Sequence, residues 1–345
     1  YQAVRVCSED GKAWLPIDCE TGELCVLGEC KKTVCVPGQK VCEGESKVKV
    51  CAADGQSWGA GQDCKSGAYC LGGTCVSLCE QNLKVASHIG CEYWSVDLDN
   101  ADDFTSGSNP QNTPHSVVIA NPGIYDATVA FDVPAPFKIS APSYVIAAGK
   151  SVEFKMPVMN PQQDTIAPMA IHFTTDQPVV AYQFNPFNAE KAHSNDGSLL
   201  LPHNTLGKEY YAVTRVSTPD ATGVIPGGPK LPSQLGYFSI VATLPGQTTV
   251  TVTIGAGGYV KKHPQTGLSI GPGQTVTTTL QAYDVLTLAG YSKVFAPVSN
   301  LTGSHIKATR PVAVFGGHEE TVVTYNKSPK NCCAEHIEEQ LLPVK

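Results

Sequence analysis

Twelve of the fourteen cysteines lie within the first 91 residues, and this crowding constrains the fold more than any other feature. Zinc sites use close cysteine pairs set well apart from a second pair or from a histidine pair. Here the spacings are fairly even, and the only histidine in the stretch is His88. We therefore predict disulfides, which form in an oxidising compartment and favour an extracellular or cell-surface protein.

The cysteine-rich region contains a repeat. The run Val6–Trp14 returns as Val50–Trp58, and the cysteines that follow return at offsets of 44 (51 − 7) to 45 (70 − 25) residues. We predict two small units, residues 1–34 and 35–78, which disulfides must hold because such short units bury little core. We expect the two tryptophans to cover the disulfides. The first unit lacks the front of the pattern, so we expect further units upstream.

The predicted disulfide cysteines fall into three groups. The sequence does not choose among the pairings within the two units. Two leftover cysteines are predicted to close the junction with the next domain, and two adjacent ones either form a vicinal disulfide or bond elsewhere, including to a neighbouring subunit. In this order the groups are Cys7, Cys19, Cys25, Cys30, Cys35, Cys42, Cys51, Cys64, Cys70 and Cys75; Cys79 and Cys91; Cys332 and Cys333.

A second, longer repeat follows. Matching phrases are 117 residues apart at Gly90 and Gly207, and 133 residues apart at Pro178 and Pro311. Along the chain the offset only grows, which indicates one ancestral domain that was duplicated and lengthened in its loops. We predict domains at residues 79–203 and 204–345.

One further match has an intermediate offset of 124, between the turns that begin at Gly149 and Gly273. The apolar residues within each copy alternate, as in Thr248–Ile254, and this period of two predicts half-buried antiparallel strands. Glycine and proline clusters separate these runs. The fold class is therefore all-β, with tandem β-sandwich-like domains behind small disulfide-rich repeats. Only His336–Leu342 suggests a short helix.

Charge and hydropathy exclude two classes of partner. The chain has 24 Lys and Arg against 31 Asp and Glu, a net charge of −7. Nucleic-acid binding requires a basic face that displaces counterions from phosphate, so no nucleic-acid partner is expected. No stretch approaches the roughly 20 apolar residues of a membrane span, so none is expected in this fragment.

Three phrases resemble the N-terminal region of IgGFc-binding proteins: Asn195–Pro202 with the following Leu206–Tyr210, Thr309–His318, and Cys333–Gln340. Many bacterial members, notably from myxobacteria, carry this module behind Cys-rich repeats with an Ile-Gly-Cys-Glu-Tyr junction, here Ile89–Tyr93. The resemblance covers roughly residues 79–345. It implies an extracellular protein of β modules devoted to binding or surface structure, which continues beyond this chain. Antibody Fc binding is not carried over, because the family's namesake has many additional domains.

The sequence contains no assembled catalytic set, and we predict that the protein is not an enzyme. His-Glu-x-x-His motifs and phosphate loops are absent. Gly55–Gly59 matches the Gly-x-Ser-x-Gly pattern, but a nucleophile elbow needs an α/β-hydrolase sheet, so we interpret the match as chance. His318–Glu320 and Glu335–Glu339 contain metal-ligand residue types. Their place in the family-like phrases favours a structural role instead, with His318 at a strand end and Glu338 or Glu339 near a turn.

Calcium is the only cofactor that the sequence brings forward. Asp97, Asp99, Asp102 and Asp103 offer clustered hard oxygen ligands. The segment lacks the glycine and the distal glutamate of an EF-hand loop. The alternative, which we favour, is a solvated loop after a strand at Tyr93–Trp94.

The sequence therefore predicts a non-catalytic adhesion or binding protein, with a partner that is a protein or glycan on a cell surface or in a matrix. The alternative is a structural subunit of an extracellular fibre, filament or sheath. That subunit would bind copies of itself through edge strands or through Cys332 and Cys333. A third hypothesis, a hydrolase or its carbohydrate-binding accessory, is weaker because two of the three tryptophans lie in the cysteine-rich region.

Overall fold

The computed structural model is almost entirely β-structure, which confirms the predicted fold class. It divides into two compact units, Tyr1–Gln81 and Asn82–Lys345. No described helix is long and apolar enough to cross a membrane. The structure describes residues 3–8, 12, 14–26, 29–65, 67–102, 109–159, 161–187, 194–228, 230–294, 297–322 and 334–344, with only the backbone at 7, 14 and 26.

The first unit consists of short antiparallel hairpins that repeat along the chain. The β3–β4 hairpin pairs Cys25 with Cys30, and the β8–β9 hairpin pairs Cys70 with Cys75 in the same register. The predicted repeat is thus also a repeat of structure. Its strands are β1 (Ala3–Cys7), β2 (Trp14–Asp18), β3 (Glu23–Val26), β4 (Glu29–Lys32), β5 (Lys40–Glu43), β6 (Lys47–Val50), β7 (Gln62–Asp63), β8 (Ala68–Leu71) and β9 (Thr74–Ser77), and the five-residue helix α1 (Leu78–Asn82) follows.

Disulfides close the second repeat unit on itself. Its six cysteines pair as Cys35–Cys51, Cys42–Cys70 and Cys64–Cys75. Cys19–Cys30 of the first repeat is the equivalent of Cys64–Cys75, and both bridges span 11 residues. Cross-links of this length stabilise a small unit by about 3 kcal/mol each, chiefly by restricting the unfolded chain.

The remaining cysteines divide into three cases. Cys79 and Cys91 are each disulfide-bonded, and the pairing of one with the other stays a prediction. Cys25 has no disulfide partner among the described side chains. Cys332 and Cys333 lie outside the described residues, so the structure does not bear on their bonding.

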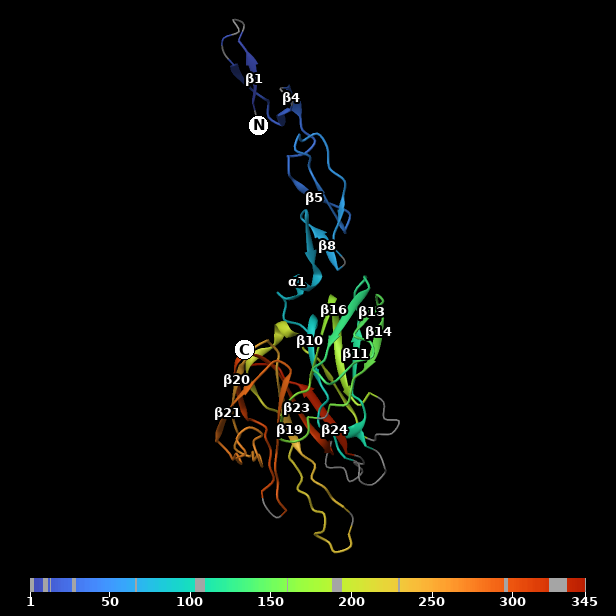
Figure 1. Cartoon of the computed structure of the whole chain (residues 1–345), viewed down its shortest axis with the longest axis vertical. Helices are drawn as coiled ribbons and strands as arrows, with labels where there is room; N and C mark the ends of the chain where they lie inside the picture. The colour runs from blue at the N-terminus through green and yellow to red at the C-terminus, as the bar shows by residue number, and fades with distance from the viewer. Residues whose placement is uncertain are drawn as a thin grey trace, which may run out of the picture. The chain divides into compact units, whose positions relative to one another are not determined.

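The first copy of the large repeat is a small two-layer sandwich arranged around one long strand, β16 (Figure 1). Residues 172–174 of β16 pair with β10 and β12, whereas residues 182–184 pair with β11 and β17. Proline at position 178 lacks a ladder N–H, and the strand passes there from one layer to the other. The strands are β10 (Ile89–Val96), β11 (Ser116–Ala120), β12 (Ala127–Asp132), β13 (Ser143–Ile146), β14 (Ser151–Lys155), β15 (Thr165–Pro168), β16 (Ala170–Asn185) and β17 (Asp196–Leu199), with a 3₁₀ turn at Pro110–Asn112.

The second copy repeats this plan around β23. Residues 305–307 of β23 pair with β18 and β20, and residues 315–318 pair with β19 and β24. Pro311 lies between the two halves, as Pro178 does in β16. The strands are β18 (Gly207–Tyr211), β19 (Gly236–Ala242), β20 (Thr248–Thr253), β21 (Thr275–Leu280), β22 (Asp284–Ala289), β23 (His305–Thr321) and β24 (Glu335–Gln340), after a 3₁₀ turn at His203–Thr205.

The duplication extends to individual contacts. Each copy opens on a strand with a bulge after its glycine, Gly90 or Gly207. A Cβ built on Gly90 would lie 2.2 Å from Cβ of Pro202, and one on Gly207 would lie 2.3 Å from Cβ of Pro343. In both copies the Leu-Leu-Pro phrase that follows the last strand therefore covers the glycine of the first strand.

The tyrosine of each opening strand has the same role in both copies. Tyr93 donates its hydroxyl to the carbonyl of Val179 at 2.6 Å, and Tyr210 donates to that of Val312 at 2.7 Å. Both bonds tie the opening strand to the central strand just beyond its proline. The repeated phrase thus encodes one structural device used twice.

One sequence match joined strands that are not equivalent. Strand order makes β13 the counterpart of β21 and β14 the counterpart of β22. The turn at Gly149 precedes β14, whereas the turn at Gly273 precedes β21. The match is therefore one strand out of step. The cause is the β20–β21 connection, which is longer than the β12–β13 connection, so similar turn residues recur at different places.

The two copies share one apolar cluster, and a second cluster has all its buried residues in the second copy. A single apolar cluster contains Val117 and Phe173 from the first copy and Tyr237 and Phe315 from the second. Strand β15 of the first copy also pairs with β22 at the edge of the second copy's sheet. The predicted boundary at residues 203/204 thus lies between two sheets of one compact unit.

The helix predicted at His336–Leu342 is wrong. Residues Glu335–Gln340 form strand β24, which pairs with the end of β23. The alternating burial of its side chains, with His336, Glu338 and Gln340 inside, is a strand pattern that the run of good helix formers concealed.

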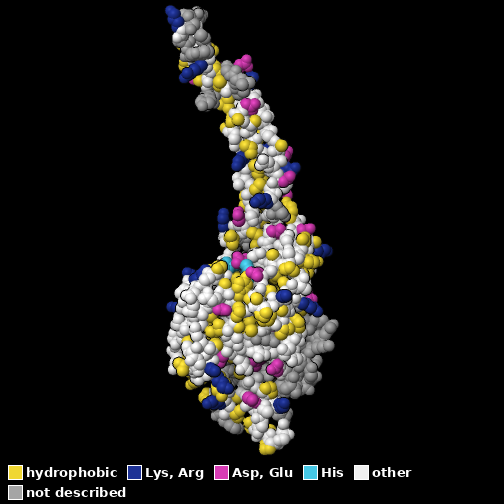
Figure 2. Space-filling model, in the orientation of Figure 1, with side chains coloured by type: hydrophobic (Ala, Val, Ile, Leu, Met, Phe, Trp, Pro, Cys, Tyr) yellow, Lys and Arg dark blue, Asp and Glu magenta, His cyan; other side chains and the backbone are white. Residues whose placement is uncertain are grey.

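The surface has no extended basic region on the face shown in Figure 2, where Lys and Arg side chains are scattered among Asp and Glu.

Candidate functional site

Strands β17 and β24 meet through side chains in place of a backbone ladder. Ser194, Asp196 and Ser198 accept hydrogen bonds from the backbone N–H groups of residues 336, 338 and 340, at 2.6, 2.9 and 2.8 Å. The acceptors are two residues apart, as are the donors, so Asp196 and Ser198 share one face of β17, and Ser194 lies two residues before that strand begins. This side-chain ladder satisfies the edge of β24 at the contact between the two copies.

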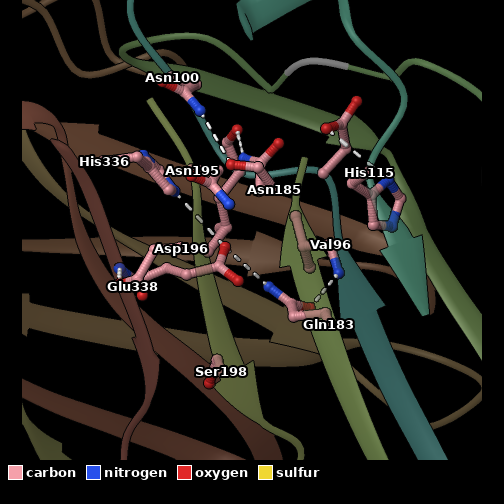
Figure 3. A network of polar contacts seen from close by, with 12 residues as sticks. Val96, Asn100, His115, Gln183, Asn185, Asn195, Asp196, Ser198, His336 and Glu338 are labelled. Carbon is pink, nitrogen blue, oxygen red and sulfur yellow. Dashed lines mark hydrogen bonds and ion pairs between the residues drawn. The ribbon is translucent and has the colours of Figure 1, made fainter. Parts of the chain in front are cut away.

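The ladder continues into a buried polar network (Figure 3). Gln183 accepts the backbone N–H of Val96 at 3.1 Å and donates to Oε2 of Glu338 at 3.2 Å. Nε2 of His336 lies 3.5 Å from the same carboxylate oxygen. Burial raises the pKa of Glu338, and the hydrogen bond from His336 opposes that shift. Gln183 and His336 thus contact one oxygen of this buried carboxyl group, whereas Oε1 of Glu338 has no hydrogen-bond partner among the described residues.

Residues 97–101 are buried, contrary to our expectation of a solvated loop, and Asp102 at the end of the described segment is exposed. Asp97, Asp99 and Asn100 are at most 3% exposed. Asp97 accepts the backbone N–H of Met159 at 2.7 Å, and Asp99 accepts that of Gln163 at 2.8 Å. The segment is buried because its carboxylates satisfy the N–H groups of the connection that leads from β14 to β15.

Asp99, one of the calcium candidates, forms a carboxyl pair with Glu319, which belongs to the separate His318–Glu320 phrase. Each is hydrogen-bonded to the other, and burial raises the pKa of Asp99 to about 6 and that of Glu319 well above its ordinary value. Glu319 also accepts the backbone N–H of Leu235 at 2.8 Å. Two adjacent carboxyl groups cannot readily both ionise, so the pair shares a proton near neutral pH.

The described residues do not form the ligand cage that the calcium hypothesis requires. Among the residues that the structure describes, no group of three or more His, Cys, Asp or Glu side chains is arranged to hold a metal ion. Asp102 lines a pocket with Asp99 and Glu319, and Asp103 lies outside the described residues. Calcium binding stays a prediction.

The two His- and Glu-containing phrases have structural contacts. His318 lies three residues before β23 ends, and its Nε2 lies 3.0 Å from the carbonyl of Val216. Burial lowers the pKa of His318 to about 4. Nδ1 of His336 lies 3.4 Å from the carbonyl of Glu319. Glu338 and Glu339 lie within β24 and not near a turn. Ser57 of the chance elbow lies in the cysteine-rich unit, just before the bridge between Trp58 and Cys51.

A run of three adjoining pockets lies at the loop end of the second copy. A pocket of about 130 Å³ at Asp99 and Glu319 shares Gln163 and Ser233 with a pocket of about 400 Å³. The latter shares Lys261, Tyr291 and Lys293 with a third of about 360 Å³. Residues from both copies therefore line this run of adjoining pockets, which is called the depression below. Pockets of this size are typical of small-molecule sites.

Tyr259 and Tyr291 lie on paired backbone segments within this depression. The N–H of Tyr291 donates to the carbonyl of Tyr259 at 2.7 Å, and Val260 forms an antiparallel bridge with Gly290. Oγ of the fully buried Ser299 accepts the N–H of Tyr259 at 2.9 Å and donates to its carbonyl at 2.9 Å. This serine fixes the backbone that carries the tyrosines.

Two further serines extend the support. Ser299 donates its N–H to Oγ of Ser292 at 2.7 Å, and Ser292 donates to the carbonyl of Ser217 at 3.1 Å. Nζ of Lys261 lies 5.1 Å from the centre of the Tyr291 ring, a cation–π geometry. The tyrosines and lysines are thus held by a buried scaffold, as binding groups should be.

Sequence reasoning missed these residues. Tyr259, Lys261, Tyr291 and Lys293 lie in two loops about 30 residues apart, and no spacing joins them before the strands pair. The one available signal was two Tyr-x-Lys patterns, starting at 259 and 291, each in a loop that follows a threonine- or leucine-rich strand.

The family model of the IgGFc binding protein matches residues 196–345, which confirms the resemblance over the second copy and the last strand of the first. No curated protein matches the chain. Among solved structures, a crystal structure of a mutant major pilin from Streptococcus pyogenes is 9% identical, with 74% of this chain and 94% of that chain covered and a TM-score of 0.10, too low to carry an argument. The family match and the disulfides indicate an extracellular protein with a binding role.

Proposed function

We propose that this chain is a non-catalytic adhesion protein of a cell surface or secreted matrix, which holds its partner at the loop end of the second copy. The observation that carries this proposal is the run of adjoining pockets from Asp99 to Tyr259, lined by residues of both copies. Loops on a rigid β scaffold are the usual place for binding residues.

The chemistry of the depression supports binding over catalysis. Its most buried carboxyl groups are used by the fold, since Asp99, Glu319 and Asp164 each accept backbone N–H groups. A nucleophile activated by an adjacent base is the signature of covalent catalysis, and no described serine of the pockets has a histidine partner. The cysteine-rich units suit the same role, because their disulfides resist unfolding outside the cell.

A binding assay tests the proposal. The chain, secreted with its disulfides intact, is coated on beads and presented to cells and to extracted extracellular matrix. We expect saturable attachment that soluble chain competes away. Attachment no greater than that of beads coated with an unrelated disulfide-rich protein would contradict the adhesion role.

The fibre alternative has one supporting observation. Strands β13, β14, β15 and β21 each have one free edge among the described strands, and such edges can pair with another copy. Sedimentation of the native protein with and without reductant separates the two functions. A fibre subunit sediments as a polymer, whereas an adhesin stays monomeric under both conditions.

A further inference from the structure

We propose that the pocket between Tyr259 and Tyr291 binds an acidic saccharide, a sugar ring that carries a carboxylate or a sulfate. This inference rests on the proposed binding function and names the ligand class. The inference rests on the exposed ring of Tyr259, on two lysines without a carboxylate partner, and on the pocket that these residues line.

The pocket offers aromatic surface to a flat apolar ligand face. Tyr259 is 49% exposed although its backbone is fixed on both sides by Ser299. Gly271 lies against one edge of its ring, where an added Cβ would come within 3.3 Å of Cε1. The C–H groups on one side of a pyranose ring form the kind of apolar face that packs on a tyrosine, whose hydroxyl stays free for polar contact.

The pocket beside Tyr259 is lined by two lysines and by no described carboxylate in a chain of net charge −7, and the adjoining larger pocket also contains Asp164 and the exposed Asp220. Lys261 and Lys293 are exposed and line both larger pockets, and neither has a carboxylate within 4.0 Å among the described residues. The nearby Asp164 is engaged by the backbone: its two carboxylate oxygens accept the N–H groups of Ala289 and Lys262 at 3.0 and 3.2 Å. Two ammonium groups without a carboxylate partner, that of Lys261 lying over the Tyr291 ring, favour an anionic ligand.

The remaining walls distinguish a saccharide from an acidic peptide. Hydroxyl-bearing Ser233, Ser269 and Ser292 line the two pockets beside the tyrosines and lysines. A sugar presents an apolar face, several hydroxyls and its charge within one ring. An acidic peptide separates its charge from any flat apolar surface by a flexible side chain, so the same pocket satisfies less of it.

Affinity electrophoresis of the whole chain tests the inference. The probes are polygalacturonate for carboxylate, heparin for sulfate, dextran for a neutral sugar and poly-glutamate for an acidic peptide. We expect retardation by polygalacturonate or heparin, weakened by added salt, and none by dextran or poly-glutamate. Whichever acidic polysaccharide binds identifies the charged group.

Pocket variants locate the site. Tyr259→Ala and the double change Lys261→Ala with Lys293→Ala should each weaken binding at least tenfold. The matched controls are Tyr144→Ala, with a tyrosine 45% exposed on β13, and Lys150→Ala with Lys155→Ala, which alters net charge equally. Circular dichroism and melting of every variant verify that the fold is kept.

Several results would overturn the inference. Equal binding of dextran or poly-glutamate contradicts the ligand class, and equal losses in pocket and control variants contradict the location. Attachment to cells or matrix without binding of either acidic polysaccharide overturns this inference while the adhesion function stands. Absence of attachment to every surface removes both.

Discussion

The side-chain ladder between β17 and β24 makes a quantitative prediction. In Ser198→Ala, the backbone N–H of Gln340 loses its 2.8 Å acceptor. Ser198 is fully buried and Gln340 is 3% exposed, so water cannot readily replace the lost acceptor. An orphaned buried donor costs about 1–3 kcal/mol, and we expect about 2 kcal/mol of unfolding free energy to be lost. For a unit of this size that corresponds to a fall in Tm of about 4–8 °C.

Chemical and thermal denaturation of the whole chain measure this loss in the transition of the second unit. Ser143→Ala, an exposed serine on edge strand β13, is the matched control and should change stability by less than about 0.5 kcal/mol. Asp196→Asn keeps an acceptor oxygen and should cost less than Asp196→Ala. A Ser198→Ala variant as stable as the Ser143→Ala control would refute the ladder as a stabilising contact.

The duplication, the carboxyl pair, the disulfides and the calcium hypothesis each give a further prediction. Gly90→Ala and Gly207→Ala should each destabilise the second unit by about 1–3 kcal/mol, because both place a Cβ against a proline; unequal effects in denaturation would mean that the copies are not equivalent. The pKa of Asp99 is raised to about 6 in the folded state, so its contribution to stability is present below pH 4 and falls as pH rises through 6; Asp99→Asn should flatten that fall in Tm measured against pH. Cys64→Ser with Cys75→Ser should lower the stability of the first unit by about 3 kcal/mol and leave the second transition in place, as seen by calorimetry. A chelator should leave the Tm unchanged, and a drop on chelation restored by calcium would show that Asp97–Asp102 binds the ion.

The sequence indicated the repeats well because both carry local signals. Cysteine spacing predicted units whose hairpins superimpose in register, and the period-two strands predicted a sandwich. The phrases that carry the family resemblance proved structural: Ser198 and His336 lie in the ladder, and Gly207 lies against Pro343. A phrase can thus be diagnostic of a fold because of the structural contacts that its residues make.

Tertiary contacts explain what sequence reasoning missed. The burial of Asp97 and Asp99 depends on backbone N–H groups more than 60 residues away, so the many polar residues of the segment 97–103 suggested a loop in water. Strand β24 has a helical composition, and only its pairing with β23 decides its conformation. Tyr259 and Tyr291 become neighbours only through a single bridge between loops.

Strand β15 has a consequence for how this protein can be divided. It is encoded within the first copy, between β14 and β16, yet it completes the sheet edge of the second copy at β22. A fragment that begins near residue 196, where the family match begins, therefore leaves β22 with an open edge. Such a fragment would be prone to edge-to-edge association. Because a strand of the first copy completes the sheet of the second, the smallest piece expected to behave as a soluble monomer retains both copies.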